Sequence, residues 1–104
     1  MKRGEIWWAR LPPPDETRPV VLVSRDEAYA KRAFVMVAPV TTHVRDLGSE
    51  VSVGPAEGVP RDGVANCESV ETIARSLLVR RAGTLTPGRV VELDTALKFA
   101  LGLE

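Results

Sequence analysis

The chain has 104 residues, a single cysteine, a single histidine and a formal net charge of zero. This length supports one domain with one hydrophobic core, and the balanced charge excludes an overall field that would attract polyanions. One cysteine excludes a disulfide framework, and no apolar run is long enough for a signal peptide or a membrane span, so we expect a cytoplasmic protein with a single domain over residues 1–104.

Most of the chain is predicted to form short strands. Apolar runs are separated by clusters of proline and glycine, and loops are predicted over residues 11–17 and 54–63. Pro39, inside one apolar run, predicts that its strand lies at a sheet edge or contains a bulge. The expected strands cover residues 5–11, 20–24, 34–41, 50–53, 64–68, 70–73 and 83–85.

Two helices are predicted beside these strands. Residues 26–32 begin with acidic and end with basic side chains, as a short helix does. Thr86 and Pro87 are typical of the N-cap and first residue of a second helix, which extends to Leu101. Its apolar residues at helical spacing are Val90, Leu93, Leu97, Ala100 and Leu101. The sequence therefore predicts a mostly β (α+β) fold, a small barrel with a C-terminal helix.

Arg18 lies where the Pro-rich loop meets a strand predicted to be buried on both faces. Pro19 disfavours a helical backbone at Arg18 and favours an extended one. A guanidinium is always charged and can bind a phosphate through two parallel hydrogen bonds. The alternative is an arginine that forms an ordinary salt bridge or anchors the loop.

Further polar candidates lie near the ends of two other predicted strands. The hydroxyls of Thr41 and Thr42 could donate to a phosphate oxygen or accept from a ribose 2′-hydroxyl. His43 could act as a general acid or base. Glu68 could accept a proton from a 2′-hydroxyl or neutralise Arg18. The alternatives are ordinary turn contacts for the threonines and solvated surface positions for His43 and Glu68.

Trp7 and Trp8 are adjacent in a predicted strand, so their side chains point to opposite faces. One is expected to fill the core, and the other is available for a dimer interface, a partner peptide or a stacked base. The basic pair Arg80 and Arg81 could contact phosphates or form a solvated face.

The sequence lacks the residues of a metal centre or of a large cofactor site. It contains no HxxxH, CxxC or DxD pattern, no P-loop and no dinucleotide-binding glycine fingerprint. Cys67 is expected to pack as a small apolar residue, because no nearby residue obviously lowers the pKa of its thiol. We therefore expect no cofactor.

Six segments occur in an order and spacing that are typical of one family. They are Gly4-Glu5-Ile6-Trp7-Trp8, Arg18-Pro19-Val20-Val21-Leu22-Val23, Ala38-Pro39-Val40-Thr41-Thr42, Asp62-Gly63-Val64 through Glu68, Thr72-Ile73 and Gly83-Thr84-Leu85. With these segments and the closing helix, essentially the whole chain resembles the MazF/PemK toxins of bacterial toxin–antitoxin pairs.

The resemblance implies a homodimeric SH3-like β-barrel that cleaves single-stranded RNA sequence-specifically and without metal. In this family the 2′-hydroxyl attacks its own phosphate and leaves 2′,3′-cyclic phosphate and 5′-hydroxyl ends. By this resemblance Arg18 handles the scissile phosphate, Thr41 is an active-site residue, and Glu68 serves substrate contact or proton transfer. The residues expected to bind RNA are Trp8, Thr17, Thr42, His43 and Ser69. A cognate antitoxin is the expected protein partner, binding across the RNA groove, and no membrane is expected.

The chain departs from many members of this family around the implied site. The loop before Arg18 is compact, whereas many relatives have a longer loop with glycine and serine. Ser69 stands where a glutamine is common, Glu71 where an arginine is usual, and Asn66 where some relatives have an arginine. The general base and acid remain open between Glu68, His43 and another group.

Two other functions are compatible with the same barrel. CcdB-type toxins share it and act on DNA gyrase by protein binding alone, without chemistry of their own. A non-catalytic RNA-binding barrel is the second alternative.

Overall fold

The computed structural model describes residues 1–14 and 16–103, so Asp15 of the predicted loop over residues 11–17 lies outside the described residues. The strands are β1 (Glu5–Arg10), β2 (Thr17–Leu22), β3 (Phe34–Thr41), β4 (Glu50–Val53), β5 (Gly63–Asn66), β6 (Glu71–Ala74) and β7 (Leu78–Thr84). The helices are α1 (Asp26–Lys31) and α2 (Pro87–Leu101), and the 3₁₀ turns are η1 (Pro55–Glu57), η2 (Cys67–Ser69) and η3 (Arg75–Leu77).

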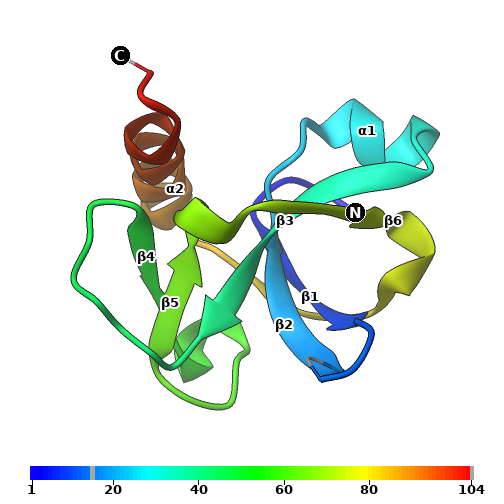
Figure 1. Cartoon of the computed structure of the whole chain (residues 1–104), viewed down its shortest axis with the longest axis horizontal. Coiled ribbons are helices and arrows are strands. Elements are labelled where there is room, and N and C mark those ends of the chain that lie inside the picture. The colour runs from blue at the N-terminus through cyan, green and yellow to red at the C-terminus, as the bar shows by residue number, and fades with distance from the viewer. Residues whose placement is uncertain (15, 104) are drawn as a thin grey trace.

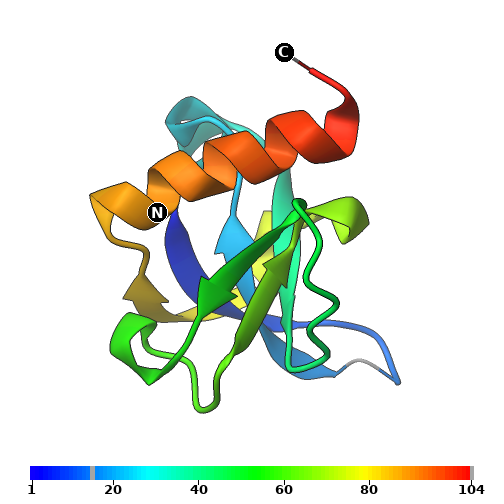
Figure 2. The same cartoon turned by 90° about the vertical axis from the view of Figure 1, so that its left-hand side faces the viewer.

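The strands form one antiparallel sheet that curls into a half-barrel (Figure 1). Its order is β4-β5-β3-β2-β1-β7, with β6 paired to β3 off this path. Helix α2 packs against β4 and η2, and Figure 2 shows it running along one side of the curled sheet. The predicted mostly β fold with a C-terminal helix is confirmed.

Pro39 is predicted to mark either a sheet edge or a bulge. Strand β3 is paired on both of its edges, so the predicted edge position is wrong. One edge of β3 pairs with β2, where Pro39 lies opposite Val20. The other edge pairs with β6 as far as Val37 and with β5 only from Val40 onward. Pro39 therefore lies at the gap between two partner strands, where its missing N–H removes no bond of either ladder.

Several predicted boundaries shift because tertiary pairing overrides local pattern. Strand β2 begins at Thr17 rather than Val20, since its first residues pair with β1. Strand β7 begins at Leu78, five residues before the predicted start at residue 83. Four of the residues after Leu78 are exposed, and they do not alternate with buried residues as in a half-buried strand. Glu68, predicted at the end of a strand, lies in the turn η2.

Helix α2 follows its sequence signals closely. The Thr86 side chain caps its first turn by accepting from the Arg89 N–H, and Gly102 closes the helix with a φ of 70°. Leu93 is fully buried in the main core, whereas Leu101, which shares the apolar spacing, is 68% exposed. Neither helix in the described part of the chain is long and apolar enough to cross a membrane.

Arg3 ties the N-terminus to both helices. Its guanidinium forms an ion pair with Asp94 of α2 at 2.7 Å and donates to the Val23 carbonyl at 3.0 Å. Its backbone N–H donates to the Asp26 carboxylate at 2.6 Å, at the start of α1. One residue thus holds the N-terminus, the end of β2 and both helices together.

We expect Leu93→Ala to destabilise the fold by about 2–5 kcal/mol, because it leaves a cavity in the core beneath α2. Urea denaturation followed by circular dichroism measures the change. Val91→Ala on the same helix, where the side chain is 64% exposed, is the control and should shift stability by at most about 0.5 kcal/mol. Equal effects of the two changes would contradict the packing of α2.

Candidate active site

A polar hollow of about 300 Å³ lies at the ends of β2 and β3, beside β5 and the turn η2. Its walls are formed by Arg18, Pro39, Thr41, His43, Arg45, Asn66, Ser69 and Glu71. Four of the residues predicted from the sequence are therefore brought together here, namely Arg18, Thr41, His43 and Ser69. We refer to this hollow as the phosphate cavity, after the ligand that its chemistry suits.

Arg18 is the second residue of β2 and is half-buried. Its Nη2 donates to the Val40 carbonyl at 3.1 Å. This bond fixes the guanidinium against the end of β3, on the side of the strand that forms the cavity. A positioned, permanently charged fork of donors is well suited to a phosphate group.

Thr41 is the last residue of β3, and its hydroxyl organises the chain that follows. Its Oγ1 accepts from the His43 N–H at 3.1 Å, which turns His43 back toward the cavity. The Thr41 carbonyl also lies directly against Gly63, at the start of β5, where a Cβ would collide with it. Gly63, part of the Asp-Gly-Val motif, thus allows β5 to approach the strand end that carries Thr41.

The turn η2 positions Ser69 through Asn66. The Asn66 Oδ1 accepts from the Glu68 N–H at 2.9 Å, and its Nδ2 donates to Ser69 Oγ at 3.1 Å. Ser69 consequently lines the cavity, while the Glu68 side chain is exposed and is not among the lining residues. The carboxylate that does line the cavity belongs to Glu71.

Arg45 is the cavity residue that sequence reasoning missed. It lies in the segment between β3 and β4, which has no regular pattern that could have placed it. The Glu50 carboxylate holds this segment by accepting from the Arg45 N–H at 3.1 Å and from the Leu47 N–H at 3.3 Å. Glu71 was noted from the sequence only as a departure from the family, and it proves to be a wall of the cavity.

The other three predicted RNA-binding residues lie outside this cavity. Thr17 is exposed at the start of β2. Trp8 and Thr42 line a second hollow, of about 240 Å³, on the other side of the same strand ends. Trp7 packs against a core cluster, whereas Trp8 lies beneath the Arg80 guanidinium, so the two indoles do point to opposite faces.

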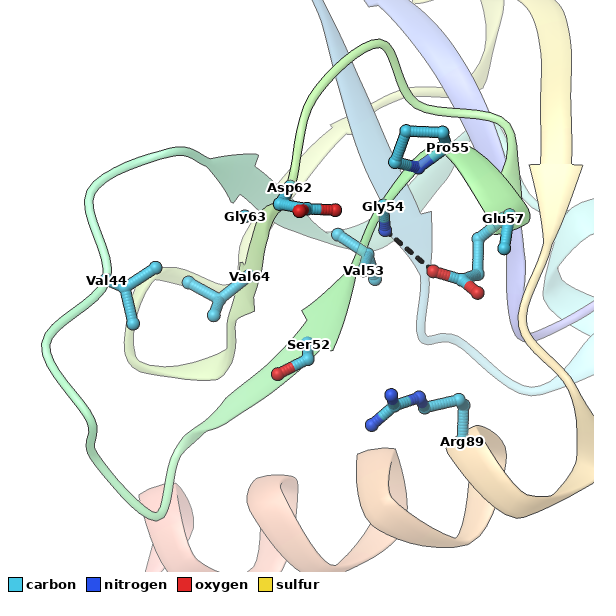
Figure 3. A pocket seen from close by; sticks show the side chains of 11 residues that line it. Val44, Ser52, Val53, Gly54, Pro55, Glu57, Asp62, Gly63, Val64 and Arg89 are labelled. Atoms are coloured by element: carbon cyan, nitrogen blue, oxygen red, sulfur yellow. Dashed lines mark hydrogen bonds between the residues drawn. The ribbon is translucent and has the colours of Figure 1, made fainter.

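A third hollow, of about 400 Å³, lies between the β4–β5 connection and the first turn of α2 (Figure 3). Two of its charged side chains, Glu57 and Arg89, have partners. The Glu57 carboxylate accepts from the Gly54 N–H at 2.6 Å, and Arg89 forms an ion pair with Glu92 at 2.9 Å. None of the residues predicted for the site lines it, so the candidate active site is the phosphate cavity.

Cys67, the first residue of η2, is buried in the main core, as the sequence predicted. Burial raises the pKa of its thiol to about 11, so the thiol stays protonated at neutral pH. Across residues 1–14 and 16–103, no three side chains of histidine, cysteine, aspartate or glutamate are grouped so that they could hold a metal ion.

A family model described as the PemK-like, MazF-like toxin of type II toxin-antitoxin system matches residues 2–101. The probable endoribonuclease MazF5 of Mycobacterium tuberculosis is 40% identical over 100 residues, which cover 95% of this chain and 91% of that protein.

Solved structures show the same similarity. The Mycobacterium tuberculosis toxin MazF-mt6 superposes with a TM-score of 0.88 and 33% identity, covering 96% of this chain and 98% of that one. An endoribonuclease from a mycobacterial species, in complex with its cognate antitoxin, superposes with a TM-score of 0.88 and 27% identity over 100% of this chain and 97% of that one.

We expect Cys67 in the folded protein to resist alkylation by iodoacetamide at pH 8. With a pKa of about 11, only about a thousandth of the thiol is ionised at this pH, and burial also blocks the reagent. Mass spectrometry measures the modified fraction, and the same protein unfolded in urea, where alkylation should be rapid, is the control. Rapid modification of the folded protein would contradict the packing role of Cys67.

Proposed function

Because the chain belongs to the PemK-like, MazF-like family of type II toxins, we propose that it is the toxin of a toxin–antitoxin pair and acts as an endoribonuclease on single-stranded RNA. The observation that carries this proposal is the meeting of Arg18 and Thr41 at one polar cavity. These two residues lie more than twenty positions apart in the chain, and only the pairing of β2 with β3 brings them together.

In the proposed reaction the ribose 2′-hydroxyl attacks the adjacent phosphate and displaces the 5′-oxygen of the next nucleotide. Negative charge increases on the non-bridging phosphate oxygens as the phosphorane forms. The Arg18 guanidinium, already held by the Val40 carbonyl, stabilises that charge without reorganisation, and the Thr41 hydroxyl donates to the same group. The products are a 2′,3′-cyclic phosphate and a 5′-hydroxyl, and a strand without 2′-hydroxyls is not cleaved.

Among the described residues, one imidazole and two carboxyl side chains at or beside this site are available for proton transfer. His43 and Glu71 line the cavity, and Glu68 lies on the exposed side of the adjacent turn. We propose that the acid and base are drawn from these three. The pH–rate profiles of the single variants His43→Ala, Glu68→Gln and Glu71→Gln assign them, because loss of a group removes its limb of the profile.

We further propose that the toxin is a homodimer in the cytoplasm and that a cognate antitoxin covers the RNA site. The exposed large apolar side chains include Phe34 and Met36 on β3 and Phe99 and Leu101 at the end of α2. Exposed apolar groups of this size are typical of surfaces that bind a protein partner. A relative of known structure is itself bound to its cognate antitoxin.

We expect Arg18→Ala to lower the rate of RNA cleavage by about 100-fold or more, because it removes the charge that stabilises the phosphorane. The assay uses pooled single-stranded RNA in EDTA, with sequencing of the new ends. Arg18→Lys restores a charge but not the fork of donors, so its cleavage rate should fall between that of the unchanged protein and that of Arg18→Ala.

Arg32→Ala is the matched control for this experiment, because Arg32 is an exposed arginine just after α1, away from the cavity. Its cleavage rate should equal that of the unchanged protein. If the Arg18→Ala protein is folded and remains toxic while RNA stays intact, the nuclease proposal is wrong and a protein target of the CcdB type is favoured.

We expect Thr41→Val to lower the cleavage rate by roughly 100-fold, because the isosteric side chain cannot donate to the phosphate or accept from the His43 N–H. Thr41→Ser keeps the hydroxyl and should retain activity within roughly tenfold of the original. Thr95→Val on α2 is the distant control. Equal rates for Thr41→Val and Thr41→Ser would show that the hydroxyl takes no part.

A further inference from the structure

The second hollow is more apolar than the phosphate cavity. Its walls are formed by Trp8, Pro19, Val40, Thr42, Val59, Pro60 and Arg61, around a volume of about 240 Å³. An indole and two prolines supply rigid surfaces, and the volume is below the range of pockets that hold drug-sized ligands. We refer to this hollow as the Trp8 hollow. It is suited to one flat ring rather than to an extended ligand.

Strand alternation places the Trp8 hollow beside the phosphate cavity. Arg18 and Thr41 face the cavity, while their chain neighbours Pro19 and Val40 face the hollow. Successive residues of a strand point to opposite faces, so the two hollows share the same backbone as a common wall. At the end of β3 they meet, because Thr41 lines the one and Thr42 the other.

Trp8 is held by its cross-strand neighbours. It lies opposite Pro19 on β2 and opposite Arg80 on β7, so the three side chains form a row across the sheet. The Arg80 guanidinium carbon lies 5.5 Å from the centroid of the indole ring. This cation–π contact fixes the ring and brings a positive charge to the edge of the hollow.

The charge around both hollows favours a polyanion. Among the described residues, three arginines, Arg18, Arg45 and Arg61, line them, against one carboxylate, that of Glu71. An apolar slot of this kind is also compatible with a peptide side chain. The arginines and the shared wall with the phosphate cavity favour the nucleic acid.

We propose that the Trp8 hollow is a base-binding subsite for the RNA, taking a base adjacent to the scissile phosphate. The base stacks on the Trp8 indole, and Arg61 and Thr42 hydrogen-bond its edge, so this subsite contributes to the choice of cleavage sequence. This inference rests on the proposed function, since it assumes that RNA occupies the phosphate cavity.

The kinetic test compares Trp8→Ala, Trp8→Phe and Arg61→Ala on pooled single-stranded RNA. We expect Trp8→Ala to raise KM by about 5- to 150-fold with a much smaller change in kcat, because a stacking contact is lost but the phosphate contacts remain. Trp8→Phe keeps an aromatic face and should recover most of the loss. Arg61→Ala should relax the base preference at a single position next to the cleaved bond.

Arg80 and Arg81 provide a matched pair of controls on one strand. Arg80 covers Trp8, whereas Arg81 lies opposite Trp7 and pairs with Glu5 at 3.4 Å, on the other face. Arg80→Ala should weaken RNA binding, and Arg81→Ala, with the same change in net charge, should weaken it less. Equal effects would mean that only bulk charge matters, and the subsite would be rejected.

A binding measurement separates this inference from the proposed function. The probe is a random-sequence 2′-O-methyl RNA, which 2′-hydroxyl attack cannot cleave, and the readout is fluorescence of Trp8 in a Trp7→Phe protein. Saturable quenching that is lost in Arg61→Ala supports the subsite even if Arg18→Ala leaves cleavage unchanged. No quenching of Trp8 by the bound RNA, together with unaltered KM and base preference in the Trp8 and Arg61 variants, would overturn the subsite, even if Arg18 proves essential, and would assign the hollow to a protein partner.

Discussion

The pairing of β3 on both of its edges is the constraint on which the rest of this structure depends. One edge of β3 is paired with β2, while the other passes from β6 to β5 at Pro39. A proline in the middle of a continuous ladder would leave a carbonyl without its donor, but at the gap between two partners it removes nothing. The sheet can therefore curl at this point, which brings the start of β5 against Thr41 and forms the walls of the phosphate cavity from β2, β3, β5, β6, the turn η2 and the segment after β3.

Alternation along two strand ends then separates two kinds of surface. Polar and charged side chains at Arg18 and Thr41 face one side, and the apolar rings at Pro19 and Trp8 face the other. The same backbone carries both, so their spacing is fixed by covalent geometry and by ladder bonds rather than by flexible loops. A substrate with alternating phosphates and bases matches such an arrangement, because one group of each kind can be bound without any movement of the protein.

The sequence predicts the parts of this site that depend on local pattern. Strand β3, helix α2 with its Thr86 cap and the burial of Cys67 follow from apolar runs, capping residues and composition. The parts that depend on long-range pairing were not predicted. Most of β7 was missed because its arginines break the alternation of apolar and polar residues that marks a strand. Arg45 was missed because the Glu50 carboxylate holds its segment by accepting from backbone N–H groups, and such bonds leave no periodic signal in the sequence. The exposed position of Glu68 results from the Asn66 cap of η2, a detail of one turn.

Arginine has two separate uses in this chain, and that division explains how a protein of zero net charge can favour an anionic ligand. Arg3, Arg81 and Arg89 lie in ion pairs with Asp94, Glu5 and Glu92, which hold the N-terminus, β1 against β7 and the first turns of α2. Burial alone would raise the pKa of Glu5, but the hydrogen bonds from Trp7 and Lys2 and the charge of Arg81 together lower it, so this carboxylate stays ionised and the pair persists. Arg18, Arg45 and Arg61 instead line the two hollows. These three arginines place positive charge at the two hollows, and since the net charge supplies no long-range attraction, selection of the ligand depends on short-range contacts within these hollows.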